Sequence, residues 1–169
     1  YIWRHDVSGA AGVVINKKCQ QPDFKHICNE GTIHRLPKIN HPVYYGGPVL
    51  TNVVGVLHST DYVLHSTNTL TEDKVGFTLD RQMLEAIAKG QGPKNKLITL
   101  GMANWTTGQL EEELEHPRNP AMSWLIMDYD EKFVFGQLDD DKSDDLWERC
   151  VSQAIRRKTK EITSKVFKD

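Results

Sequence analysis

The sequence predicts an α+β fold built around a mixed β-sheet. Short runs rich in Val, Ile, Leu, Tyr and Phe are joined in some places by tight turns and in others by amphipathic helices. Tight turns make antiparallel neighbours and helical connections make strand–helix–strand units, so a sheet with both is mixed. The chain has 169 residues, 38% of them hydrophobic and 8% aromatic, and we expect residues 1–169 to form a single domain.

The start of the chain is expected to hold two strands and a short helix. Residues 1–3 are typical of the end of a strand whose beginning is missing, so we expect an N-terminal truncation. Small residues at 8–11 form a turn into a strand at 12–16. Pro22 then opens a short helix that Gly31 ends.

A hairpin is predicted next. A strand at 43–45 is cut off by Gly46-Gly47-Pro48. The β-rich runs at 53–59 and 62–66 flank the turn Thr60-Asp61, which predicts that the two runs pair antiparallel.

The clearest helix covers residues 81–89 and follows a strand at 75–79. Asp80 is a favourable N-cap, and Gly90 is a suitable terminator. The apolar residues recur with helical spacing, so this helix is expected to pack on the sheet. They are Met83, Leu84, Ile87 and Ala88.

The most informative segment follows this helix. An apolar strand at 97–100 is predicted to stop at Gly101, turn across Trp105 and enter a helix at 107–115. Thr106 and Gln109 have the spacing of a capping box at the start of that helix.

The C-terminal part is predicted to contain one more hairpin and a last helix. Residues 122–127 and 132–135 should pair antiparallel across a turn at 128–131. Ser143 caps a helix at 144–155, which should also pack on the sheet. Its apolar face consists of Leu146, Trp147, Cys150, Val151 and Ala154. Because Trp105 and Trp124 lie among apolar neighbours, we expect both rings to be largely buried.

Charge is unevenly distributed although the net charge is only −2. Residues 111–148 carry thirteen acidic residues against three basic ones, and residues 156–168 carry six basic residues against Glu161. This split could steer partners of either sign. The simpler interpretation, which we favour, is a set of solvated helix faces.

Five motifs occur in the order found in one bacterial family. They are His5-Asp6 with residues 9–17; residues 45–49 with 55–59; residues 84–93; the Trp105 segment with residues 108–113; and Ser123-Trp124-Leu125 followed by Leu146-Trp147. On these residues, about 5–152, the chain resembles the YqgE/AlgH family.

The resemblance implies an α+β fold whose mixed sheet is split and partly barrel-like, with helices outside it. It also implies the nominal label of transcriptional regulator, which carries no mechanism. The family's usual Gly-Tyr-Ala-Gly-Trp is replaced here by Gly-Met-Ala-Asn-Trp at 101–105. The segment after Gln153 also departs from the family, which predicts a distinctive basic helical tail at 156–169.

The strand–turn–helix segment at 101–109 is the leading candidate for a ligand site. Backbone amides at a helix start can hold a phosphate or carboxylate, and Trp105 could form a wall of such a site. The candidate residues are Gly46, Gly47, Asn104, Trp105, Thr106, Thr107 and Gly108. The simpler interpretation, which we favour, is that the threonines cap their own helix and Trp105 fills core.

Other chemistries are disfavoured by spacing. Cys19, His26, Cys28 and His34 are residue types that bind zinc, but they lack a Cys-x-x-Cys knuckle, so no metal site is expected. His58 and Ser59 are strand neighbours that face opposite ways, so with Asp61 they do not form a hydrolase triad. The P-loop motif and the Gly-x-Gly-x-x-Gly dinucleotide-binding motif are both missing from the sequence, and no cofactor is expected.

These observations favour a cytoplasmic protein with a non-enzymatic regulatory or interaction role. Three cysteines are too few for a disulfide scaffold, and the longest apolar runs are too short to span a membrane. The expected partner is an unknown protein. A sensor of a small anionic ligand, using residues 101–109, is the alternative. A DNA-binding regulator is a weaker one, because only the tail at 156–168 offers cations without competing acids.

Overall fold

The computed structural model describes residues 1–20, 41–70, 74–116, 124–136 and 146–166. The chain divides into two compact units, Tyr1–Glu111 and Glu112–Asp169. The helix predicted at 22–31 and the cap predicted at Ser143 lie outside the described residues. The expectation of a single domain stays a prediction.

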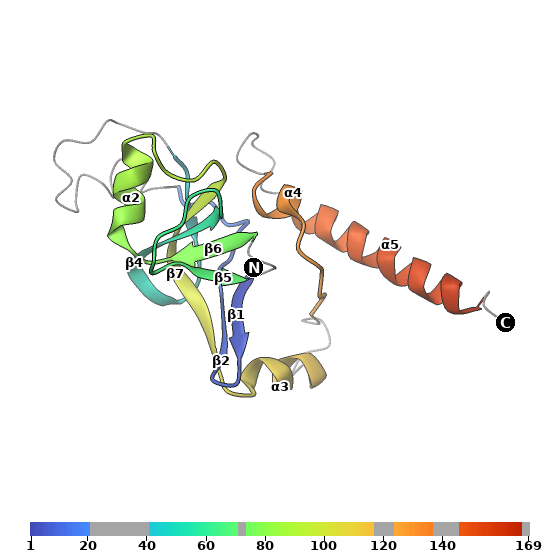
Figure 1. Ribbon diagram of the computed structural model, residues 1–169. Coiled ribbons are helices and arrows are strands. Elements are labelled where there is room, and N and C mark those ends of the chain that lie inside the picture. The colour runs from blue at the N-terminus through green and yellow to red at the C-terminus, as the bar shows by residue number, and fades with distance from the viewer. Residues whose placement is uncertain (21–40, 71–73, 117–123, 137–145, 167–169) are drawn as a thin grey trace. The chain divides into compact units, whose positions relative to one another are not determined.

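The first unit is a barrel-like sheet whose strand order is β1-β2-β7-β4-β6-β5, with β3 paired to β7 (Figure 1). The strands are β1 Ile2–Asp6, β2 Gly9–Gly12, β3 Val43–Tyr45, β4 Val49–Ser59, β5 Asn68–Leu70, β6 Val75–Thr78 and β7 Lys96–Thr106. The two ends of this order approach each other, and the ring of Trp3 in β1 stacks on Phe77 in β6 with 4.5 Å between centroids. The predicted α+β fold with a mixed, partly barrel-like sheet is therefore confirmed.

The long strand β7 organises this sheet. Ile98 pairs with β3 in parallel and with β4 antiparallel, so these two strands lie on opposite sides of β7. Residues 103–106 pair with β2. The prediction that the strand stops at Gly101 and turns across Trp105 is therefore wrong. Gly101, with φ +75°, marks an irregularity inside β7, and pairing with β2 keeps the next residues extended.

Two glycines let the chain cross β7 between β3 and β4. Because β3 and β4 flank β7, the connection between them has to pass over its backbone. A Cβ on Gly46 would lie 2.2 Å from the carbonyl oxygen of Gly101, and one on Gly47 would lie 2.2 Å from the carbonyl carbon of Met102. A side chain at either position would collide with main chain, which explains the glycine pair.

The close approach of β2 to its neighbouring strands also explains why β2 consists of small residues. We expected a turn at 8–11 and a strand at 12–16, but the strand is Gly9–Gly12 and all four residues are buried. A Cβ on Gly9 would lie 2.2 Å from the carbonyl oxygen of Trp105 in the neighbouring β7. The small residues are needed between strands and not in a turn.

The hairpin predicted for 53–59 and 62–66 is wrong. β4 pairs instead with β6 and β7, and residues 62–66 contain no strand. Leu64 and Thr67 close a turn, because the Thr67 amide donates to the Leu64 carbonyl (3.0 Å) and the Leu64 amide donates to Thr67 Oγ1 (3.1 Å). The next strand, β5, starts only at Asn68 and pairs with β6.

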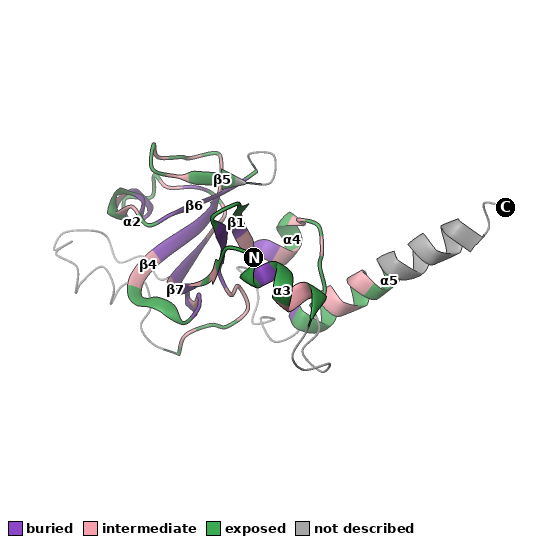
Figure 2. Ribbon diagram, turned by 90° about the horizontal axis from the view of Figure 1, so that it is seen from below, coloured by how far each residue is buried: buried purple, intermediate pink, exposed green. Residues whose placement is uncertain are grey.

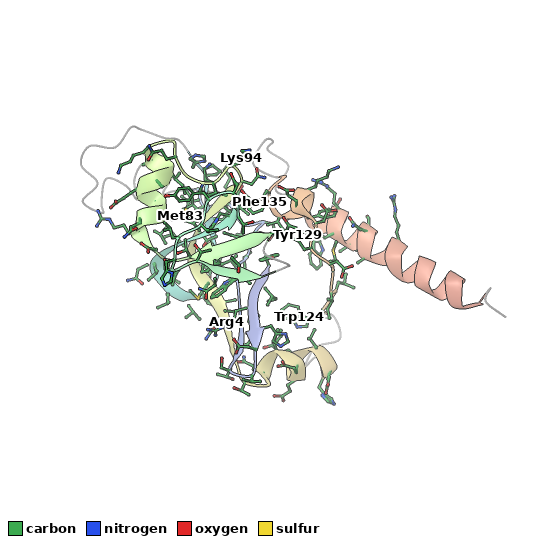
Figure 3. The ribbon with its side chains drawn as sticks, viewed as in Figure 1. Arg4, Met83, Lys94, Trp124, Tyr129 and Phe135 are labelled. Carbon is green, nitrogen blue, oxygen red and sulfur yellow. The ribbon has the colours of Figure 1, made fainter. Side chains whose placement is uncertain are left out.

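Helix α2, Arg81–Ala88, confirms the prediction for 81–89. The carboxylate of Asp80 accepts the Gln82 amide at 2.9 Å, and Gly90 with φ +73° follows the helix. The predicted apolar stripe is buried against the sheet, where Met83 is fully covered (Figure 3). This core consists of Val43, Val56, Met83, Leu84, Ile87, Ala88 and Ile98.

Helix α3, Gln109–Glu115, follows β7 and starts two residues later than the helix predicted at 107–115. The second unit then contains α4, Glu131–Val134, and α5, Leu146–Val166. The predicted hairpin is wrong in its described part, because residues 124–130 have no regular structure and Asp130 starts a helix by accepting the Lys132 amide at 2.9 Å. Residues 122–123 lie outside the described residues.

Helix α5 begins where the described residues resume and extends to Val166, beyond the predicted end at 155. Its packing on the sheet stays a prediction. Trp105 is partly buried, and Trp124 is 42% exposed, so the expectation of a largely buried ring is wrong for Trp124. The reason is that Trp124 lies in an irregular segment and not in the interior of a strand.

Candidate functional site

The structure separates the predicted ligand-site residues into two groups. Asn104, Thr106, Thr107 and Gly108 are exposed around the end of β7 and the start of α3, with Trp105 partly buried among them. Gly46 and Gly47 are buried instead against residues 101–103 of β7, where they serve the chain crossing. The two glycines are therefore buried against the backbone of β7, whereas the other candidate residues are exposed or partly buried.

Polar groups at the start of α3 already have partners within the chain. The Thr106 amide donates to Gln109 Oε1 at 3.0 Å, which is the glutamine half of the predicted capping box. The Thr106 hydroxyl donates to the same oxygen at 3.2 Å, and the Thr107 hydroxyl donates to the Val7 carbonyl at 3.2 Å. Only the glutamine half of the capping box is present in these contacts, because both threonine hydroxyls donate in them and do not accept a helix amide. Capping by the threonines and anion binding at this segment both stay predictions.

An ion pair ties the same helix start to the β1–β2 hairpin. His5 Nε2 donates to Glu111 Oε1 at 2.5 Å. This hydrogen bond holds the pKa of the Glu111 carboxyl below its ordinary value. Together with the Thr107 bond, it fixes the start of α3 to the hairpin.

Ser59 and Asp61, two of the residue types found in a hydrolase triad, have a structural role here. We call their hydrogen-bonded arrangement with Asn95 the clamp. Ser59 Oγ donates to Asp61 at 2.5 Å and accepts the Asn95 amide at 3.0 Å. Burial opposes the ionisation of Asp61, but bonds from Ser59 and from the Lys94 amide outweigh it and hold its pKa below the ordinary value. The clamp joins the end of β4 to the loop before β7.

His58 takes no part in this clamp and is fully buried. Its Nδ1 donates to the Ser59 carbonyl at 2.9 Å, and its Nε2 has no hydrogen-bond partner. Burial lowers the pKa of this imidazole despite the bond to Ser59 and the nearby Asp61 charge. His58 does not face Ser59 Oγ, so the expected absence of a triad agrees with this geometry.

Metal-binding side chains do not gather within the part of the chain that the structure describes: no group of three or more His, Cys, Asp or Glu residues there could hold an ion. Cys19 is partly buried, and burial raises the pKa of its thiol. The other three residues considered for zinc, His26, Cys28 and His34, lie outside the described residues.

A surface groove between α4 and α5 was missed by sequence reasoning. It has a volume of about 620 Å³ and is lined by Phe133, Glu148, Arg149, Ser152, Gln153 and Arg156. The Arg149 guanidinium lies over the Phe133 ring, 5.4 Å from its centroid. The spacing 149, 152, 153, 156 would have revealed a shared helix face, but the predicted hairpin placed Phe133 on a strand.

The other side of α5 carries exposed apolar side chains. Trp147 is 60% exposed and Ile155 is 57% exposed, with the partly buried Val151 between them. Helical geometry places these three residues within an arc of about 80°. We call them the α5 stripe. Of the predicted apolar face, Leu146 is buried, and the first turns of α5 otherwise show intermediate and exposed residues (Figure 2).

Among the described residues, no helix is long and apolar enough to cross a membrane.

Comparisons with known proteins agree on one family. The AlgH-like family profile matches residues 1–157. A UPF0301 protein of Bradyrhizobium sp. strain BTAi1 is 36% identical over 152 residues, covering 85% of this chain and 68% of the relative. A UPF0301 protein of Pseudomonas entomophila is 37% identical over 145 residues, covering 84% and 72%.

The solution structure of the AlgH protein from Pseudomonas aeruginosa is similar as well, with a TM-score of 0.65 and 33% identity over 80% of this chain and 69% of that one. The motifs, the barrel-like sheet and these matches together show that the chain belongs to the YqgE/AlgH family, also described as UPF0301.

Proposed function

We propose that this protein is a non-enzymatic interaction protein with a regulatory role, and that it binds a partner protein through helix α5. The observation that carries the proposal is the α5 stripe, where Trp147 and Ile155 are 60% and 57% exposed. The proposal retains the cytoplasmic location expected from the sequence.

The stripe has the composition of a binding surface. Trp is enriched among the residues that dominate interface energetics, and a buried Trp removes about 150–250 Å² from water. Exposed apolar residues rimmed by polar ones mark interaction sites. Here the polar rim includes Glu148 and Ser152, which lie next to the stripe on the same helix.

A non-enzymatic role is supported by how the reactive side chains of the first unit are used. Ser59 and Asp61 are engaged with the 94–95 loop, and His58 is buried without access to either of them. Ser59 and Asp61 are used in the clamp and His58 is buried away from them, which supports the proposal that these three groups do not act together on a substrate.

The two alternatives, a sensor of a small anionic ligand and a DNA-binding regulator, receive less support. The exposed residues at 104–108 have polar groups already engaged with Gln109 and Val7, which leaves fewer for an anion. Nucleic acid would meet an acidic run at 111–148, and we expect any binding to be weak, sensitive to salt and confined to residues 156–168.

Affinity capture with quantitative mass spectrometry tests the proposal. The baits are the parent chain, a Trp147→Ser/Ile155→Ser variant, and a Leu79→Ser control in the first unit, where Leu79 is 45% exposed. We expect the partner to be depleted about fivefold or more with the stripe variant and unchanged with the control, because hot-spot residues each contribute more than about 1 kcal/mol.

Direct binding is then measured between purified partner and each bait. Equal capture and equal affinity for all three baits would refute a role for α5. Thermal melts of the three baits serve as the folding control, since all three substitutions are at exposed positions and should leave the melting temperature nearly unchanged.

A further inference from the structure

The groove between α4 and α5 offers two separated cations along one helix face. Arg149 and Arg156 are both exposed, and within the part of the chain that the structure describes neither guanidinium forms an ion pair. They are seven residues apart, which is two helical turns or about 10.5 Å along the axis. Ser152 and Gln153 lie between them on the same face and can bond to a peptide backbone.

One of the two guanidiniums is held in place. Arg149 stacks on Phe133 at 5.4 Å from the ring centroid. Stacking occupies the flat face of a guanidinium and leaves its N–H edge available, and that edge matches a carboxylate with two parallel hydrogen bonds. Phe133 therefore contributes to the groove as the aromatic ring that orients Arg149.

The spacing of the cations fits one peptide conformation. A polyproline II segment has three residues per turn and rises about 3.1 Å per residue, so side chains three positions apart lie on the same side about 9.3 Å from each other. This nearly equals the separation of the two arginines. An extended β-strand, by contrast, points residues i and i+3 to opposite sides.

We propose that the groove binds an acidic, proline-containing peptide in which two carboxylates are three residues apart, with Arg149 and Arg156 each taking one carboxylate. The presence of Glu148 in the groove favours a peptide over nucleic acid. A nucleic-acid strand carries a phosphate on every nucleotide and would bring one against Glu148, whereas a peptide can place an uncharged residue there. This inference rests on the proposed interaction function and names the class of partner segment.

Fluorescence anisotropy with the full chain tests the proposal. The probe is a fluorescein-labelled peptide Gly-Glu-Pro-Pro-Glu-Gly, and the controls are the same composition rearranged as Gly-Glu-Glu-Pro-Pro-Gly and the uncharged Gly-Gln-Pro-Pro-Gln-Gly. We expect the rearranged peptide to bind about fivefold more weakly and the uncharged one to show no measurable binding, since only the probe can reach both arginines.

Single substitutions on the protein complete the test. Arg149→Gln and Arg156→Gln should each weaken the probe about tenfold, while Lys132→Gln, an exposed cation of α4 outside the groove, should change nothing. Phe133→Leu, which keeps an apolar side chain but removes the ring face, should weaken the probe by a smaller factor. Circular dichroism confirms that each variant is folded.

Equal affinity for the probe and its rearranged form, or equal losses with Lys132→Gln, would overturn the proposal and reduce the groove to a general cation patch. Tighter binding of a DNA duplex than of the probe, lost in Arg149→Gln, would overturn the peptide assignment. If the peptide tests fail while partner capture still depends on Trp147 and Ile155, the groove inference is wrong and the interaction function stands.

Discussion

Replacing Gly46 with alanine tests the idea that the chain crosses β7 through a gap that only glycine can pass. The new Cβ would lie 2.2 Å from the Gly101 carbonyl oxygen and 2.9 Å from Thr99 Cβ. Ordinary contacts begin at 3.4 Å, so the crossing chain would have to move away by about 1.2 Å. Both neighbours belong to β7, which is held in register by β3 and β4 and cannot move alone.

The expected loss of unfolding free energy in Gly46→Ala follows from this collision. Overpacking a well-packed interior costs about 1–3 kcal/mol, and a main-chain obstacle gives way less than a side chain does. Alanine also restricts the unfolded chain, which offsets about 0.4–1 kcal/mol. We therefore expect Gly46→Ala to lower the free energy of unfolding by at least about 2 kcal/mol.

Gly90→Ala is the matched control because its Cβ would meet nothing within 4 Å, although its φ is +73°. It should lose about 1 kcal/mol from the left-handed conformation alone. Urea unfolding gives both midpoints at a common slope. A Gly46→Ala variant that is no less stable than Gly90→Ala would refute the crossing argument.

Two further substitutions probe the first unit. Burial lowers the pKa of His58 in the folded state below its unfolded value of about 6.5. The stability that the neutral, buried imidazole contributes is therefore complete above about pH 6.5, and it is lost as the pH falls from there toward the folded-state pKa. His58→Gln should therefore show a smaller decrease in urea midpoint between pH 7.5 and pH 5.5 than the parent, and an equal decrease would contradict this. Ser59→Ala leaves the Asn95 amide and the exposed Asp61 without their shared hydroxyl and should cost about 0.5–1.5 kcal/mol in the same assay. An unchanged midpoint would show that the clamp contributes nothing.

Helix α2 could be predicted from the sequence because its signals are local. Asp80, the stripe from Met83 to Ala88 and Gly90 lie within eleven consecutive residues, and each agrees with the others. The family motifs likewise predicted the mixed, barrel-like sheet. Where propensity, capping and periodicity point to the same element, the sequence suffices.

Strand pairing could not be predicted in the same way, because it depends on residues far apart in the chain. The runs at 53–59 and 62–66 looked like a hairpin, but β4 finds its partners at 75–78 and 96–102. Glycine is also ambiguous: the pattern predicts a strand end at Gly101, whereas the strand continues through Gly101 with a φ of +75°. β-rich patterning does not specify which strands become neighbours.

The candidate sites show the same limit. The capping contact between Thr106 and Gln109 was predictable from their spacing, and the structure contains it. The groove was not, because an error at 132–135 put Phe133 on a strand and hid its stacking with Arg149. Because residues 132–135 are predicted as a strand, the groove between α4 and α5 could not be predicted.

The place of β7 in the sheet has a consequence for how the protein is made. Its partners β2, β3 and β4 all come earlier in the chain, and the segment that joins them ends only at Thr106. A ribosome therefore completes three strands before it releases the one that they share. Until then, the edges of β2, β3 and β4 that pair with β7 are open to other chains, although β2 already has β1 and β4 already has β6 as a neighbour. The first unit is consequently expected to assemble late in translation, with its longest period of aggregation risk just before β7 emerges.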